Sequence, residues 1–117
     1  MPSPNSRDAV NMDELKEIMD NDLELIQDCF TDFVQEWPVQ YVEIKSAVLE
    51  KNGQKLDESA HKLKGTLKYL AAGKASEAAY YLESAGKESD FSRIEEKLEN
   101  LKNECQRVVE YIKCFNP

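Results

Sequence analysis

Histidine is almost absent from this chain, and the other residues of common metal sites are sparse. The 117 residues include a single histidine, His61, and three cysteines, Cys29, Cys105 and Cys114. No two cysteines form a Cys-x-x-Cys pair, and one histidine cannot complete a usual zinc set. Cys29 and Cys105 fall on apolar helical positions, where a reduced thiol behaves as a small hydrophobic group. We therefore expect neither a metal nor a cofactor.

Long apolar runs and a basic surface are also missing. No segment has the apolar length needed to cross a bilayer, and the N-terminus lacks the pattern of a signal peptide. Acidic residues outnumber basic ones by 23 to 15, so the net charge is −8, whereas nucleic-acid binding needs a basic face. No ATP-binding glycine loop occurs. We expect a cytoplasmic protein that contacts neither membrane nor nucleic acid and does not phosphorylate itself with ATP.

The apolar residues recur at intervals of three and four, and the strict alternation of strands is absent. This spacing predicts helices over about residues 12–19, 21–38, 39–51, 54–72, 75–85 and 89–113. Pro38 is predicted to end one helix or to open the next, and Asn52-Gly53 and Gly73 are predicted to stop helices. Because such helices must bury their apolar stripes together, we expect an all-α antiparallel four-helix bundle with short accessory helices.

The domain organisation follows from length and from the first residues. A chain of this length is one domain. Residues 1–11 hold two prolines and no periodicity, so a flexible leader or linker is expected there, before a helical-bundle domain over residues 12–117.

The single histidine lies in a stretch, residues 59–76, that contains no acidic residue and four lysines. His61 projects roughly 140° away from the centre of the apolar stripe of its helix, and so toward solvent. Gly65 stands one turn later on the same face and leaves room for another surface to approach. Lys64 and Lys68 can donate charge-assisted hydrogen bonds to phosphoryl oxygens. A nucleophilic imidazole in this setting predicts a phosphohistidine intermediate.

Residues 60–66, Ala-His-Lys-Leu-Lys-Gly-Thr, resemble the signature of histidine-containing phosphotransfer (HPt) domains, approximately His-x-Leu-Lys-Gly-Ser/Ala. The likeness continues through residues 70–72 and through residues 78–85, which resemble the family's Ala-x-x-Leu-Glu-x-Ala segment. It covers about residues 12–112. The chain departs from the pattern at Thr66, and at Ala71, where many members have glycine.

The resemblance implies a four-helix bundle whose exposed histidine takes a phosphoryl group from the aspartate of one receiver domain and passes it to another. His61 would accept the group through Nε2, Lys64 would stabilise it, and Gly65 would clear space for the receiver. Lys68 is added from helical geometry alone. The protein would be a phosphohistidine carrier in a bacterial-type two-component phosphorelay, without kinase activity of its own.

The partners implied are receiver domains of response regulators, including that of a hybrid sensor kinase, and the Mg²⁺ belongs to the receiver. The lysines would complement the acidic pocket of a receiver, because opposite charges speed and orient docking. We expect a monomer. Leu15, Ile18 and Met19 are candidates for an apolar docking surface beside the histidine.

Two other interpretations stay open. A docking-only helical adaptor would have the fold and the partners but no phosphoryl chemistry. Metal binding or acid–base chemistry at His61 would need further ligands or a carboxylate on the same face, for which Asp57 is the candidate. The sequence also fits both a free-standing protein and the C-terminal domain of a hybrid kinase.

Overall fold

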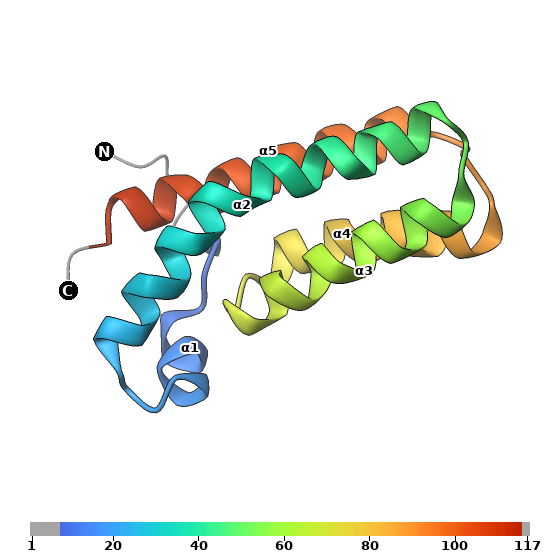
Figure 1. Cartoon of the computed structure of the whole chain (residues 1–117). Helices are drawn as coiled ribbons and strands as arrows, with labels where there is room; N and C mark the ends of the chain where they lie inside the picture. The colour runs from blue at the N-terminus through green and yellow to red at the C-terminus, as the bar shows by residue number, and fades with distance from the viewer. Residues whose placement is uncertain (1–7, 116–117) are drawn as a thin grey trace.

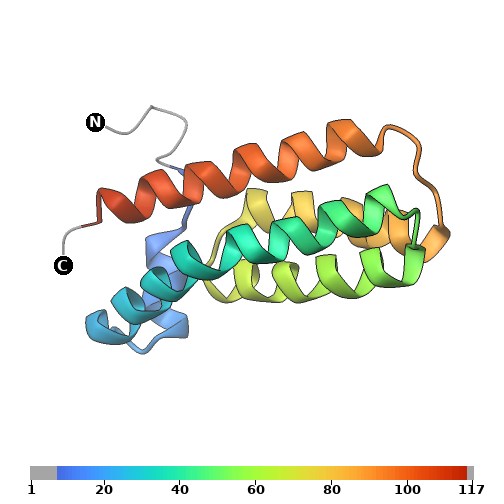
Figure 2. The same ribbon diagram turned by 45° about the horizontal axis from the view of Figure 1, so that its top comes forward.

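The computed structural model describes residues 8–115, and within them the chain forms five helices and no strand. These are α1 (Met12–Ile18), α2 (Leu23–Leu49), α3 (Gly53–Tyr69), α4 (Gly73–Glu88) and α5 (Ile94–Lys113). Helices α2 to α5 pack in chain order, and α5 returns against α2, which closes the bundle (Figure 1). The short α1 lies at the end of the bundle where α3 ends, as both Figure 1 and Figure 2 show. The predicted four-helix bundle with an accessory helix is confirmed.

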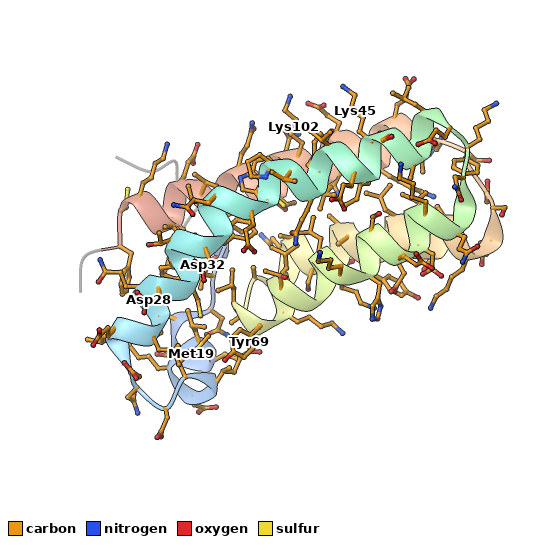
Figure 3. All side chains as sticks on the ribbon, in the orientation of Figure 1. Met19, Asp28, Asp32, Lys45, Tyr69 and Lys102 are labelled. Atoms are coloured by element: carbon orange, nitrogen blue, oxygen red, sulfur yellow. The ribbon has the colours of Figure 1, made fainter. Side chains whose placement is uncertain are left out.

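The apolar stripes predicted from the spacing form a single core. In α3 the stripe is fully buried, and in α5 its central part is buried as well. Side chains fill the space between the ribbons (Figure 3). The buried members of the two stripes are Leu56, Ala60, Leu63, Leu67 and Leu70, and Leu98, Leu101, Cys105 and Val108. Burial of these stripes is the main force that holds the helices together.

Helix α2 continues through Pro38, so the predicted break between two helices at this proline is wrong. A proline inside a helix removes one backbone hydrogen bond and crowds the preceding turn, which bends a helix without necessarily ending it. The ribbon of α2 changes direction between its blue first part and its green last part (Figure 1). Phe33 before the proline and Ile44 after it are both buried. Packing along the whole of α2 thus outweighs the hydrogen bond lost and the crowding at Pro38.

The helix ends lie at residues with left-handed backbone and not at the glycines predicted as stops. Lys51 and Ala71 have φ angles of 51° and 56°, and they follow the ends of α2 and α3. Asn52 caps α3, because its Oδ1 accepts a hydrogen bond from Lys55 N–H at 3.1 Å. Gly53 and Gly73 are the first residues of α3 and α4. Helix α5 begins at Ile94, later than predicted, and follows Arg93, which has a φ angle of 54°.

The segment before α1 is tied to the bundle. Of the expected leader, residues 1–7 lie outside the described residues, while Ala9 and Val10 are buried. Asn11 caps α1 as predicted, and its N–H donates a hydrogen bond to the carbonyl oxygen of Ala71 at 2.9 Å. Residues 9–11 therefore join α1 to the end of α3.

The expected docking surface on α1 is largely wrong. Leu15 is fully buried and Met19, labelled in Figure 3, is 2% exposed, because both side chains face the bundle. Ile18 is the one of the three that reaches solvent. Among the described residues, no helix has both the length and the apolar composition that crossing a membrane requires.

Candidate functional site

His61 lies in the middle of α3, on the side away from the core. Its side chain is 69% exposed, which confirms the direction predicted from the helical phase. Gly65, one turn later, is exposed too, and a Cβ added there would meet nothing within 4 Å. The imidazole therefore stands beside an open turn of helix.

The carboxylate of Glu83, on α4, connects His61 with Lys64. Its Oε2 is hydrogen-bonded to His61 Nδ1, and its Oε1 lies 2.7 Å from Lys64 Nζ. The Glu83 side chain is only 2% exposed. Burial raises the pKa of this carboxyl, but the hydrogen bonds from Lys64 and His61 outweigh burial and leave its pKa below the ordinary value. Glu83 is therefore an ionised, buried group with two partners.

Close packing of α3 against α4 sets the register that brings these side chains together. A Cβ on Gly86 would lie 2.5 Å from the backbone nitrogen of Asp57, so the two backbones touch at this point. The two helices are antiparallel. One turn after Asp57 on α3 and one turn before Gly86 on α4, they therefore place His61 opposite Glu83. Helix α4 runs to Glu88 and includes Gly86, so the predicted end at Ala85 is wrong.

The lysines of the acid-free stretch have different surroundings. Lys64 is only 15% exposed, because its ammonium lies against Glu83 and 5.5 Å from the centre of the Tyr80 ring. Lys74 lies 3.9 Å from a carboxylate oxygen of Asp8. Lys68 is exposed and has no carboxylate within 4 Å among the residues described. The stretch is thus partly neutralised by acidic residues from other segments.

The geometry fixes which nitrogen of His61 is free to react. Because the Glu83 carboxylate can only accept, Nδ1 carries the hydrogen, and Nε2 keeps its lone pair on the exposed ring. A carboxylate bonded to Nδ1–H holds this tautomer and stabilises positive charge that develops when Nε2 forms a bond. The arrangement is suited to a nucleophilic Nε2.

Sequence reasoning missed Glu83 and considered Asp57 as the carboxylate near His61. No ion pair joins Asp57 to His61 among the described residues; its backbone contacts Gly86 instead. Glu83 lies within residues 78–85, the segment that resembles a stretch of the family pattern, and this likeness was the signal that could have pointed to it. An antiparallel pairing of this segment with α3 would have placed its glutamate near the histidine.

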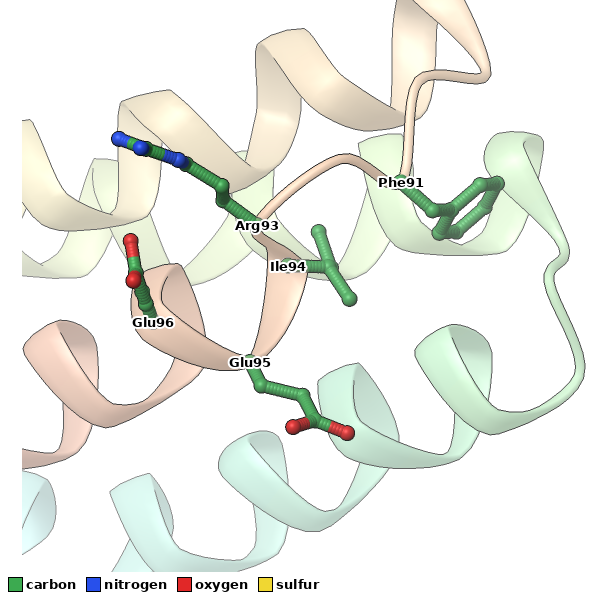
Figure 4. Close-up of a pocket in the computed structure, with 5 residues that line it drawn as sticks. All are labelled: Phe91, Arg93, Ile94, Glu95 and Glu96. Carbon is green, nitrogen blue, oxygen red and sulfur yellow. The ribbon is translucent and has the colours of Figure 1, made fainter.

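A separate hollow of about 380 Å³ lies at the connection between α4 and α5. It is lined by Phe91, Arg93, Ile94, Glu95 and Glu96 (Figure 4). Arg93 and Glu96 extend to the same side of the connection, and Glu95 points away from them. No residue of α3 lines this hollow, so it is separate from the cluster of His61, Lys64 and Glu83, called the His61 cluster below. Within residues 8–115, no group of three or more His, Cys, Asp or Glu side chains could hold a metal ion.

Comparison with known proteins gives a consistent result. The sequence model of the Hpt domain family matches residues 28–111, a span that includes His61, Lys64 and Glu83. The structure is similar to the crystal structure of histidine-containing phosphotransfer protein B from Pseudomonas aeruginosa PAO1, with a TM-score of 0.76 and 19% sequence identity. The match covers 95% of this chain and 93% of that one. No match was found among curated protein sequences.

Proposed function

The chain belongs to the Hpt domain family, whose function is histidine phosphotransfer in phosphorelays, and we propose that His61 is the residue that carries the phosphoryl group. The observation that carries the proposal is the hydrogen bond between His61 Nδ1 and the Glu83 carboxylate, which leaves Nε2 as the exposed nucleophile. His61 is also the only histidine of the chain.

In the transfer, the lone pair of His61 Nε2 attacks the phosphorus of an aspartyl phosphate on a receiver domain. A P–N bond forms as the bond between phosphorus and the aspartate oxygen breaks, and the electron pair of that bond stays on the aspartate carboxylate. Nδ1 keeps its hydrogen throughout, and Glu83 stabilises the positive charge that the ring gains. Transfer to the next receiver reverses these steps, with the same groups in place.

The neighbours of His61 have distinct roles in this proposal. Lys64, whose ammonium belongs to the same cluster, stabilises the phosphoryl oxygens. Gly65 admits the receiver, because no side chain projects from its turn. Lys68 adds positive charge one turn further along and steers the acidic pocket of the receiver toward His61. Higher ionic strength should therefore weaken docking.

The partners proposed are receiver domains, including that of a hybrid sensor kinase, and the protein acts as a cytoplasmic monomer. The acting unit is the helical domain of residues 12–117, with the preceding residues as a leader whose last part, Ala9 and Val10, packs on the bundle. The Hpt match supports partners of the receiver class.

The test is phosphoryl transfer from a phosphorylated receiver domain to the protein and to its His61→Gln variant. We expect the wild type to gain one acid-labile phosphoryl group and the variant to gain none. Because His61 is 69% exposed, the variant should keep the fold, which circular dichroism checks. Equal labelling of the variant would overturn the role of His61. A wild type that binds the receiver but takes no phosphate would instead be a docking-only adaptor.

A further inference from the structure

Two adjacent tyrosines on α4 have similar exposure but different contacts. Tyr80 is 49% exposed and Tyr81 is 44% exposed. The Lys64 ammonium lies 5.5 Å from the centre of the Tyr80 ring. Tyr81 instead donates a hydrogen bond from its hydroxyl to Glu77, away from the cluster. Of the two, only Tyr80 contacts a member of the His61 cluster. Tyr81, whose ring centroid lies 6.0 Å from that of Tyr80, provides a control of similar exposure.

The position of Lys64 needs an explanation beyond its ion pair. A lysine ammonium is strongly hydrated and sits on a flexible stem, so a lysine on an outer helix face usually extends into water. Lys55, whose ammonium lies 2.8 Å from a carboxylate oxygen of Glu50, is 39% exposed, whereas Lys64, paired at 2.7 Å, is 15% exposed. The aromatic face attracts the ammonium and covers the stem, while Glu83 binds it from another side. The two contacts together restrict where the ammonium can lie.

The register of the bundle explains why Tyr80 is in this place. The contact of Gly86 with Asp57 sets His61 opposite Glu83, and the next turn sets Lys64 opposite Tyr80. The ring thus borders the cluster on the side away from Gly86.

We propose that Tyr80 is a positioning residue for phosphotransfer, whose ring holds the Lys64 ammonium beside Glu83 and His61. The ammonium is then already in place when an anionic phosphoryl group approaches Nε2, so its ordering does not add to the barrier. The proposal rests on the proposed role of His61. It requires the aromatic face of Tyr80 and not its hydroxyl.

The experiment uses phosphoramidate as a small phosphoryl donor, which removes the need for a receiver. Nε2 attacks the phosphorus, a new P–N bond forms, and the P–N bond of the donor breaks so that ammonia leaves. We expect Tyr80→Leu to slow labelling of His61 by about two- to five-fold, the range of one exposed cation–π contact. Tyr80→Phe and Tyr81→Leu should label at the wild-type rate.

Two further measurements separate positioning from a general effect on the fold. In a Lys64→Met background, Tyr80→Leu should cause no additional slowing, because the ring acts through the lysine. In the unlabelled protein, acetylation of Lys64, followed by peptide mass spectrometry, should be faster in Tyr80→Leu and unchanged in Tyr81→Leu. This second readout does not depend on phosphoryl chemistry.

The outcomes distinguish the two proposals. If the wild type takes no phosphate on His61 from phosphoramidate or from a phosphorylated receiver, the proposed role of His61 fails, and the function of Tyr80 fails with it. If the wild type is labelled but Tyr80→Leu is labelled equally fast, only the role of Tyr80 is overturned. Equal slowing with and without Lys64 would also overturn it, because the ring would then act by another route.

Discussion

Gly65 in α3 and Gly86 in α4 both lie inside helices, yet their surroundings are opposite. A Cβ on Gly86 would lie 2.5 Å from the backbone nitrogen of Asp57, whereas a Cβ on Gly65 would meet nothing within 4 Å. A glycine costs a helix about 1 kcal/mol relative to alanine. At Gly86 this cost permits two backbones to touch, and the resulting register brings Glu83 to His61. At Gly65 the missing side chain brings no closer packing. It leaves open space beside the histidine instead.

The largest effect is expected from Gly86→Ala. The added methyl group would overlap the backbone of α3, and backbone cannot move aside as a flexible side chain can. We expect a loss of about 2–3 kcal/mol in the free energy of unfolding, the upper part of the range for overpacked sites. Urea denaturation measures this loss. A variant as stable as the wild type would show that the glycine contact does not set the register.

Glu83→Gln tests the carboxylate that the alignment of α3 with α4 brings to His61. The variant keeps the shape of the side chain but loses a buried charge bonded to Lys64 and His61. We expect a loss of about 1.5–2 kcal/mol at neutral pH, the lower part of the range for hydrogen bonds to a charged group, because glutamine can still accept hydrogen bonds. Glu77→Gln, an exposed position on the same helix, is the control and should change stability by less than about 0.5 kcal/mol.

The effect of Glu83→Gln should depend on pH in one direction. The pKa of Glu83 is lowered in the folded state, so its ionised form stabilises the fold above the ordinary carboxyl range. This stabilisation is lost as the pH falls through the lowered folded pKa. The stability difference between wild type and variant should therefore shrink on acidification. A difference that grows in acid would mean that Glu83 is protonated in the native cluster.

Gly65 should give the smallest change in stability, and with the opposite sign to Gly86. Gly65→Ala is expected to raise the free energy of unfolding by about 1 kcal/mol, because alanine favours the helix and the methyl group meets open space. Gly65→Leu should also remain folded but should slow transfer from a phosphorylated receiver. Thermal unfolding and labelling rates test the two effects. Unfolding of the leucine variant would instead assign Gly65 to packing.

Much of the fold could be predicted because helical periodicity is a local property of the sequence. The buried stripe of α3 and the exposed direction of His61 follow from a rotation of about 100° per residue. The continuity of α2 through Pro38 could not be predicted, because the burial of Phe33 and Ile44 on either side outweighs a local break. The left-handed ends at Lys51 and Ala71 likewise depend on where the next helix must pack.

Only the part of the site that lies on a single helix, α3, was predictable from the sequence. His61, Lys64 and Gly65 lie on α3, so their spacing could be interpreted from periodicity. Glu83 lies 22 residues away on α4, and its contact with His61 depends on how two helices are aligned. That alignment depends on Gly86, which the helix predicted over residues 75–85 did not include.

The most direct test of the central claim is the state of the two imidazole nitrogens of His61, measured by nitrogen NMR before and after phosphoryl transfer. In the unphosphorylated protein we predict a hydrogen on Nδ1, where Glu83 accepts it, and none on Nε2. After transfer, coupling to phosphorus should appear at Nε2, with the hydrogen still on Nδ1. A hydrogen on Nε2 in the resting neutral ring, or phosphorus bonded to Nδ1, would contradict the proposed role of Glu83 and His61.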